Sequence, residues 1–234
     1  MFHYSTKEIE ELDRIAVENG LEIRQMMELA GFHMVSVFEK EKIAQDGAVV
    51  IVCGKGNKGG DGLSAARHLV NHGWKNISVV LADAGLKPDG AHHLALAQKM
   101  GIPIFIYEKQ KAEAGEKIMN AGIIIDSLIG YHLEGAPRGV FAELISLMNK
   151  SSARVISYDL PSGADPTTGV CEGECVRADA TLTLAIPKKL FETESGRALS
   201  GAVYIADIGI PAAFYNKVIP RSRPAFPPSG LLIL

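Results

Sequence analysis

The chain has 234 residues, of which 47% are hydrophobic and 22% are charged, and its formal net charge is -3. That length suffices for one large α/β domain with a substantial core, and the composition is typical of a globular protein. The mildly acidic balance gives no electrostatic reason to expect nucleic acid or an anionic membrane as a partner. No apolar run reaches the length of a membrane span and no signal peptide is recognisable, so we expect a cytoplasmic protein.

The three cysteines, Cys53, Cys171 and Cys175, are too few for a disulfide framework, and their odd number favours a reducing compartment. Cys53 belongs to an apolar run and is expected to be a small core residue. Cys171 and Cys175 could lie close together in space, but no matching Cys or His pair completes a zinc site. We expect no catalytic role for any of them.

The first elements expected along the chain are two helices. Ser5 supplies a cap for the first, whose apolar residues repeat at helical spacing as far as Ala16. Residues 23–39 show mostly the same spacing and predict the second helix, whose methionines are expected to pack in the core.

The apolar run over residues 48–53 predicts a strand buried on both faces, and helical spacing resumes over residues 63–70. Five glycines lie in the loop between them. Because glycine lets backbone N–H groups approach a ligand closely, such a loop can cradle a phosphate. Asp61 is expected to cap the helix that follows, whose amino end adds partial positive charge.

This loop is ambiguous when it is considered alone. Gly54, Gly56 and Gly59 satisfy the dinucleotide spacing G-x-G-x-x-G, and Asp83 ends the next strand about where a ribose-binding acid would be expected. The spacing is a weak signal, and a glycine turn needed only for tight packing of the strand against the helix stays open.

Strands and helices alternate along the rest of the chain. We expect strands over residues 76–82, 102–107, 123–126, 154–159, 178–184 and 202–207, and helices over residues 90–100 and 112–120 with a short one after residue 211. This alternation predicts an α/β fold of the three-layer αβα, Rossmann-like type with a mostly parallel central sheet. Right-handed crossovers then bring the carboxyl ends of the strands to one edge, where such folds bind ligands.

Two of these strands end in an aspartate that should face the glycine loop. Asp126 begins a glycine-bearing loop that runs to Gly139, and Asp159 precedes the rigid turn Pro161-Ser162-Gly163. Each acid could instead only cap its turn. Asp159 is the candidate for proton transfer, because a partly desolvated carboxylate can hold a proton near neutral pH. His132 could contact a ligand or be an ordinary exposed histidine.

Taken together, these segments resemble the NAD(P)H-hydrate epimerase family. Residues 54–62 are similar to its substrate loop, G-x-G-N-N-G-G-D-G, residues 126–139 to its second binding segment, and residues 159–163 to its D-I-P-S-G segment. Residues 26–31 resemble its L-M-E-N-A-G signature, with Leu29 in place of the asparagine. Lys188 also matches the family pattern, although by itself it would be interpreted as a solvated lysine.

The resemblance covers residues 5–216 and implies one domain over residues 1–216, followed by a proline-rich tail over residues 217–234 that is either disordered or packed on a partner. It implies an isomerase that interconverts the R and S forms of hydrated NADH and NADPH, called NADHX and NADPHX, with Asp159 as the catalytic residue. The substrate-binding positions that it implies are Asn57, Lys58, Gly59, Gly60, Asp61, Gly130, Tyr131, His132, Leu133, Glu134, Gly135, Ala136 and Asp159.

The family resemblance also implies a potassium ion, held at the positions of Lys58, Asp126 and Ser162. Asp126 and Ser162 offer oxygen, as a hard cation requires, whereas a protonated lysine has donors and no acceptor. Two arrangements follow. Either Lys58 points away and the ion binds through backbone carbonyls, or the Lys58 ammonium occupies the cation position and potassium is not needed.

Two other classes of function stay open. A non-catalytic nucleotide-binding or scaffold homologue would explain the departures at Leu29, Lys58, Tyr131 and His132, although the retained acids argue against it. An NAD-dependent oxidoreductase would place Asp83 on a ribose hydroxyl, but the sequence shows no proton-relay set for hydride transfer. The apolar amino-terminal helices offer a surface for pairing, and related proteins commonly pair, so we expect a homodimer.

Overall fold

The computed structural model describes residues 2–219 and 224–234. Within these residues a single sheet has eight strands in the spatial order β3-β2-β1-β4-β5-β6-β7-β8. The strands are β1 (Val49–Cys53), β2 (Ile77–Leu81), β3 (Ile104–Ile106), β4 (Ile123–Ser127), β5 (Arg154–Tyr158), β6 (Ala180–Leu184), β7 (Ala202–Ala206) and β8 (Leu231–Ile233). All neighbours pair in parallel except β7 and β8.

The order of the strands reverses beside β1, which pairs with β2 on one side and β4 on the other. The chain first builds outward through β2 and β3, then returns to add β4 to β7 on the other side. In doubly wound sheets the loops that leave such neighbouring strands diverge and open a crevice at the carboxyl edge. The fold therefore places the loops after β1 and β4 at the expected binding edge.

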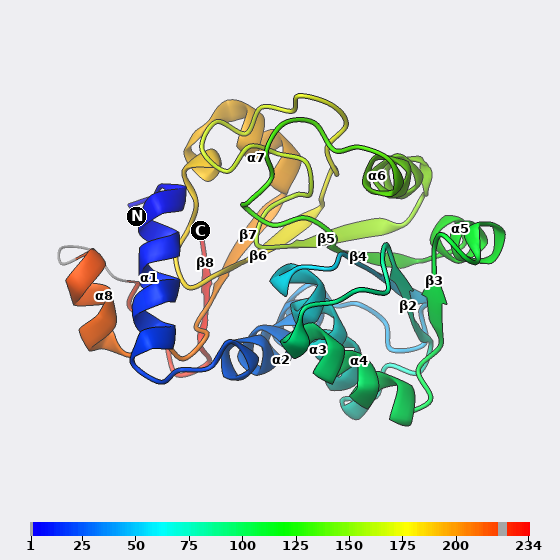
Figure 1. Cartoon of the computed structure of the whole chain (residues 1–234), viewed down its shortest axis with the longest axis horizontal. Helices are drawn as coiled ribbons and strands as arrows, with labels where there is room; N and C mark the ends of the chain where they lie inside the picture. The colour runs from blue at the N-terminus through cyan, green and yellow to red at the C-terminus, as the bar shows by residue number, and fades with distance from the viewer. Residues whose placement is uncertain (1, 220–223) are drawn as a thin grey trace.

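Helices cover both faces of the sheet (Figure 1). They are α1 (Thr6–Glu18), α2 (Ile23–Lys40), α3 (Asn57–Asn71), α4 (Pro88–Lys99), α5 (Lys111–Met119), α6 (Val140–Lys150), α7 (Glu194–Ser200) and α8 (Ala212–Val218), with a short 3₁₀ helix at Lys189–Glu192. Helices α2, α3 and α4 pack in sequence on one face, and α5 and α6 lie on the other. The three-layer αβα architecture is confirmed.

Strand β1 shows why its sequence is apolar without interruption. Val49, Ile51 and Cys53 join the core beneath α2 and α3, whereas Val50 and Val52 join the core beneath α5 and α6. Because successive side chains point to opposite faces, a strand covered on both sides needs apolar residues at every position. Cys53 is fully buried, as expected of a core residue.

Helix α3 begins earlier than the sequence predicts. It starts at Asn57 with Gly56 as its N-cap, so Asp61 lies inside the helix and does not cap it. Glycines are poor helix formers, but here they permit close packing: a Cβ on Gly59 would overlap the carbonyl oxygen of Gly54. The glycines thus bring α3 against the carboxyl end of β1.

Two helices and one strand were not expected from the sequence. Helix α6 buries Leu144, Ile145 and Met148 at helical spacing, and α7 follows the 3₁₀ helix. The end of the expected tail forms β8, antiparallel to β7, so it joins this chain's own sheet. Residues 220–223 of that tail lie outside the described residues, and the boundary between domain and tail at residue 216 stays a prediction.

Cys171 and Cys175, which the sequence allowed to lie close together, form a disulfide. These residues are four apart in the segment between β5 and β6, and a short loop of this kind closes without any larger disulfide framework. Among the described helices, none is both long and apolar enough to cross a membrane.

Candidate active site

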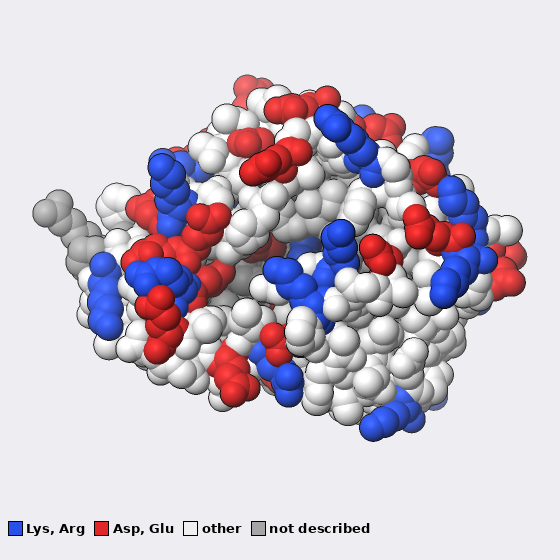
Figure 2. All heavy atoms as spheres, viewed as in Figure 1, with Lys and Arg blue, Asp and Glu red and all other residues white. Residues whose placement is uncertain are grey.

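A cavity of about 700 Å³ opens at the carboxyl edge of the sheet, within the size range of small-molecule sites. The segments that follow β1, β4, β5 and β6 form its floor, and α1 and α2 form one wall. The hollow is visible on this face of the molecule, with basic and acidic side chains around it (Figure 2). Much of its lining is apolar, including Ile9, Met26 and Ile129.

The structure brings together part of the predicted binding set. The predicted residues that line the cavity are Asn57, Lys58, Asp61, Gly130, Tyr131, His132 and Asp159. The predicted residues outside its lining are Gly59, Gly60, Leu133, Glu134, Gly135 and Ala136, whose role in binding stays a prediction. Asp126 and Ser162 are fully buried and contact the end of the Lys58 side chain.

Asp159 follows β5 and carries a buried ion pair with Lys188. Its φ of 63° lies in the left-handed region, which a non-glycine residue seldom adopts, and its N–H donates to the Leu182 carbonyl at 2.7 Å. The Lys188 ammonium also donates to the carbonyls of Leu184 at 3.0 Å and Ile186 at 3.3 Å. The interpretation of Lys188 as a solvated lysine is therefore wrong: the chain turns back after β6 and points this side chain inward.

Lys58, in the first turn of α3, reaches behind the cavity floor. Its Nζ donates to the carbonyl oxygens of Ile129 and Leu160 at 2.8 Å each and to Ser162 Oγ at 3.0 Å, and it lies 3.4 Å from Asp126 Oδ2. Burial lowers the pKa of Lys58 from its usual value, and the Asp126 carboxylate opposes that shift. The ammonium thus ties α3 to the turns after β4 and β5.

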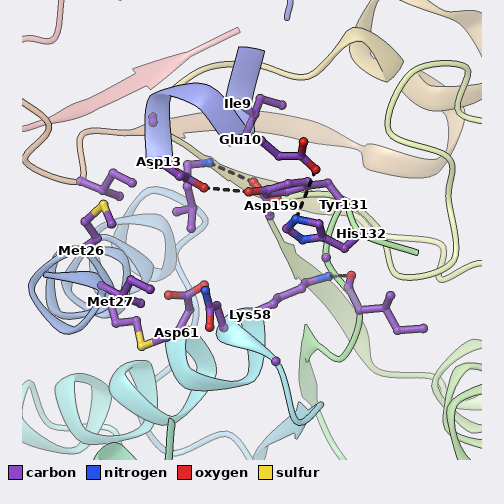
Figure 3. A pocket seen from close by; sticks show the side chains of 18 of the residues that line it. Ile9, Glu10, Asp13, Met26, Met27, Lys58, Asp61, Tyr131, His132 and Asp159 are labelled. Atoms are coloured by element: carbon purple, nitrogen blue, oxygen red, sulfur yellow. Dashed lines mark hydrogen bonds and ion pairs between the residues drawn. The ribbon is translucent and has the colours of Figure 1, made fainter. Parts of the chain in front are cut away.

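Asp61 lies one turn further along α3 and faces the cavity from beside Met27 (Figure 3). It is 7% exposed, and no described residue donates a hydrogen bond to its carboxyl group. Burial raises the pKa of Asp61 well above its ordinary value, and the nearby Asp159 carboxylate adds to the rise. This acid retains its proton at a higher pH than an exposed aspartate does.

Helix α1 supplies cavity residues that the sequence did not reveal. The Tyr131 hydroxyl donates to Asp13 at 2.7 Å, and His132 lies 3.4 Å from Glu10 (Figure 3). Burial raises the pKa of Asp13. A signal was present in the sequence, because Asp13 follows Ile9 by one helical turn and so lies along the apolar face of α1.

Asp83, the acid that an oxidoreductase would use on a ribose, does not line the cavity. Its carboxylate accepts a hydrogen bond from the Gly85 N–H at 2.8 Å, as an aspartate in a local turn does. The geometry gives Asp83 a role in that turn.

Comparison with known proteins identifies the family. The sequence matches the family described as YjeF-related protein N-terminus over residues 23–190, which is more than half of the chain. The chain belongs to this family. The matched part of this YjeF-related chain contains the segments after β1, β4, β5 and β6, but it begins after α1, so Glu10 and Asp13 lie outside it.

Curated relatives of this YjeF-related chain carry epimerase names. An NAD(P)H-hydrate epimerase of Dehalogenimonas lykanthroporepellens is 39% identical, with 88% of this chain and 82% of that protein covered. One of Rhodopirellula baltica is 36% identical, with 87% and 82% covered. A bifunctional NAD(P)H-hydrate repair enzyme Nnr of Moorella thermoacetica is 35% identical, but the chain spans only 41% of its length. The resemblance inferred from the sequence is confirmed.

The crystal structure of yeast ynu0 has the same fold, with a TM-score of 0.87 at 22% sequence identity over the whole of both chains. The two proteins therefore share the layer architecture although most of their aligned residues differ.

Proposed function

We propose that this chain is an NAD(P)H-hydrate epimerase, an isomerase that interconverts the R and S forms of NADHX and NADPHX. The observation that carries the proposal is the buried Asp159–Lys188 pair at the floor of a largely apolar cavity. Relatives of similar length and the same family bear the epimerase name. A carboxyl group held in a partly desolvated site suits proton transfer to a ring substrate.

The stereocentre of the substrate bears a hydroxyl group next to the ring nitrogen. The proton that Asp159 shares with Lys188 passes from Asp159 to that hydroxyl, the carbon–oxygen bond breaks with its electron pair leaving on oxygen, and water departs. The planar cation that remains is stabilised by the ring nitrogen. Water then adds to either face and returns a proton to Asp159, so the reaction needs no oxidant or reductant.

Lys188 acts as a positioning residue in this scheme. Two of its N–H donors are used by the carbonyls of Leu184 and Ile186, which leaves the third for Asp159. The carboxyl group is therefore held in one orientation toward the cavity. Such fixed geometry is a large part of what an active site contributes to rate.

The cavity offers groups for the rest of the nucleotide. Lys55 and Lys87 are exposed cavity residues, and their charges suit the pyrophosphate, as does the amino end of α3. Ile9 and Met26 provide apolar surface for the rings.

The direct test is to incubate the chain with one purified NADHX epimer and follow the epimer ratio by chromatography. We expect the ratio to approach equilibrium much faster than in buffer, with no net loss of NADHX. An oxidoreductase would instead give turnover in a hydride-transfer assay. An unchanged ratio at high concentrations of folded protein rules out the epimerase assignment.

We further propose that the chain acts in the cytoplasm and as a homodimer, without nucleic acid. The cytoplasmic assignment rests on the substrate, a damaged intracellular cofactor, because the Cys171–Cys175 disulfide removes the argument from cysteine usage.

Exposed apolar residues on the first two helices, among them Val17 and Phe32, support pairing of two chains. Light scattering on the purified chain should give twice the mass of one chain, and a single-chain mass contradicts the dimer.

A further inference from the structure

The Lys58 ammonium lies where the family resemblance implies a potassium ion. Four oxygens surround it: the carbonyls of Ile129 and Leu160 at 2.8 Å, Ser162 Oγ at 3.0 Å and Asp126 Oδ2 at 3.4 Å. Hard monovalent and divalent cations prefer oxygen ligands of these kinds. The surroundings are therefore those of a cation site, and a side-chain cation occupies it.

The hydrogen bonds within this cluster show that its oxygens are directed at a positive charge. Ser162 donates through both its N–H and its hydroxyl to Asp126, and the Ile129 N–H donates to Ser162 Oγ at 2.8 Å. Ser157 also donates to Asp126, at 2.8 Å. Ser162 Oγ also lies 3.2 Å from the Ile129 carbonyl oxygen, and because an ammonium has donors and no acceptor, Ser162 Oγ faces Nζ as an acceptor.

A potassium ion does not fit this cluster while Lys58 adopts this conformation. The ion would need the same four oxygens that Nζ contacts, and the side chain of Lys58 is only 5% exposed, so the ammonium and the ion compete for one volume. Lys58 cannot serve as a ligand either, because an ammonium has no acceptor. A second cation close to Nζ would also meet strong repulsion in a buried setting.

The position of Lys58 in the fold favours this arrangement. Its backbone carbonyl accepts a hydrogen bond from the Ser127 hydroxyl, which fixes the first turn of α3 against the end of β4. From there the side chain reaches Leu160 and Ser162, just beyond Asp159. The ammonium holds together three segments that form the cavity floor.

We propose that Lys58 is a built-in cation that replaces potassium, so that this chain holds the turns after β4 and β5 in place without a metal ion. The inference deepens the proposed function, because these turns carry Asp159 and part of the binding loop. Its structural consequence, independence of folding from potassium, holds whatever the chain catalyses.

The test compares thermal unfolding in potassium chloride and in choline chloride at equal ionic strength. The native chain should give the same melting temperature in both. Lys58→Asn replaces the ammonium by a side chain with a carbonyl oxygen, so it should melt at a lower temperature in choline and regain about 4 °C or more in potassium. Lys55→Asn is the matched control: it removes an exposed lysine from the same segment and should show no potassium response.

A potassium-specific rise in the melting temperature of the native chain would overturn the proposal. A folded Lys58→Asn chain with the same melting temperature in potassium and in choline would also overturn it. Lys58→Gln provides the same comparison should the asparagine variant not fold, and the measurement on the native chain needs no variant. Because unfolding needs no substrate, its result stays interpretable if the chain proves not to be an epimerase. In the epimerase assay, the native rate should change less than twofold on adding potassium, whereas a strong requirement contradicts the inference.

Discussion

Asp159 and Lys188 come from the ends of neighbouring strands, β5 and β6, and meet in a site where neither is solvated. A buried charge is costly unless it is paired, and removing one partner leaves the other uncompensated. The left-handed backbone at Asp159 is a second cost that the surrounding structure must maintain. Such costs concentrated at one residue are typical of functional sites, which supports the catalytic assignment.

Replacing Asp159 by asparagine removes the carboxyl group through which the mechanism transfers its proton. We expect kcat/KM for epimerisation to fall by about a hundredfold or more, the usual contribution of a general acid. Circular dichroism should show that the fold persists. Asp83→Asn is the matched control, because Asp83 also lies just after a strand but outside the cavity, and it should retain the native rate. Full activity in folded Asp159→Asn would refute the role given to this residue.

Asp61 gives a prediction for stability against pH. Its pKa is raised by burial, so the folded chain keeps the proton above pH 4, where an unfolded chain with an ordinary aspartate pKa of about 3.9 loses it. The contribution of Asp61 to the free energy of unfolding is therefore complete below about pH 4 and is lost as the pH rises through the raised value. Relative to the native chain, Asp61→Asn should become steadily more stable over that interval in urea unfolding.

Asp165 provides a control, because its pKa is shifted in the opposite direction to that of Asp61. Burial tends to raise its pKa, but hydrogen bonds from Thr168 and Thr167 prevail and lower it. Its contribution is present at higher pH and is lost as the pH falls through the lowered value. The loss of stability caused by Asp165→Asn, relative to the native chain, should therefore be smallest at low pH. The same pH trend in both variants would show that Asp61 is not titrating as the structure indicates.

Helix α3 carries both Lys58 and Asp61 into the site, and its glycines decide where it lies. Gly59 lies against the carbonyl of Gly54, and Gly62 against the side chains of Ser127 and Cys53. At this scale the glycine-rich segment is a packing device as much as a phosphate loop. The position of the cavity floor follows from how closely α3 approaches β1 and β4.

Two glycine-to-alanine substitutions separate packing from helix propensity. Gly59→Ala should destabilise the chain by about 1–3 kcal/mol, because its Cβ overlaps backbone that cannot move freely. Gly115→Ala, in the middle of α5 with nothing within 4 Å of the added carbon, should stabilise it by about 0.5–1 kcal/mol. Urea unfolding measures both. Equal effects at the two positions would mean that contact with Gly54 does not constrain α3.

For the whole molecule, the sequence predicted the layers because the seven parallel strands and most helices carry a recognisable apolar pattern of their own. It predicted that Asp126 and Asp159 share an edge with α3, since parallel strands end on one side. It could not place Lys188 or Asp13, because their burial depends on contacts with residues far away in the chain. It placed the start of α3 too late, because the low helix propensity of glycine was outweighed by tertiary packing. It did not predict β8, because Leu231–Ile233 gains strand structure only by pairing with β7.

The assignment at the scale of the whole molecule is that segments distant in sequence enclose one nucleotide, with Asp159 at its hydrated nicotinamide. A crystal structure of the Asp159→Asn chain with bound NADHX measures this directly. We expect the side chain of residue 159 to lie about 2.6–3.2 Å from the hydroxyl on the ring, with the pyrophosphate near the amino end of α3. A nucleotide bound outside this cavity, or one with its hydrated ring far from residue 159, would contradict it.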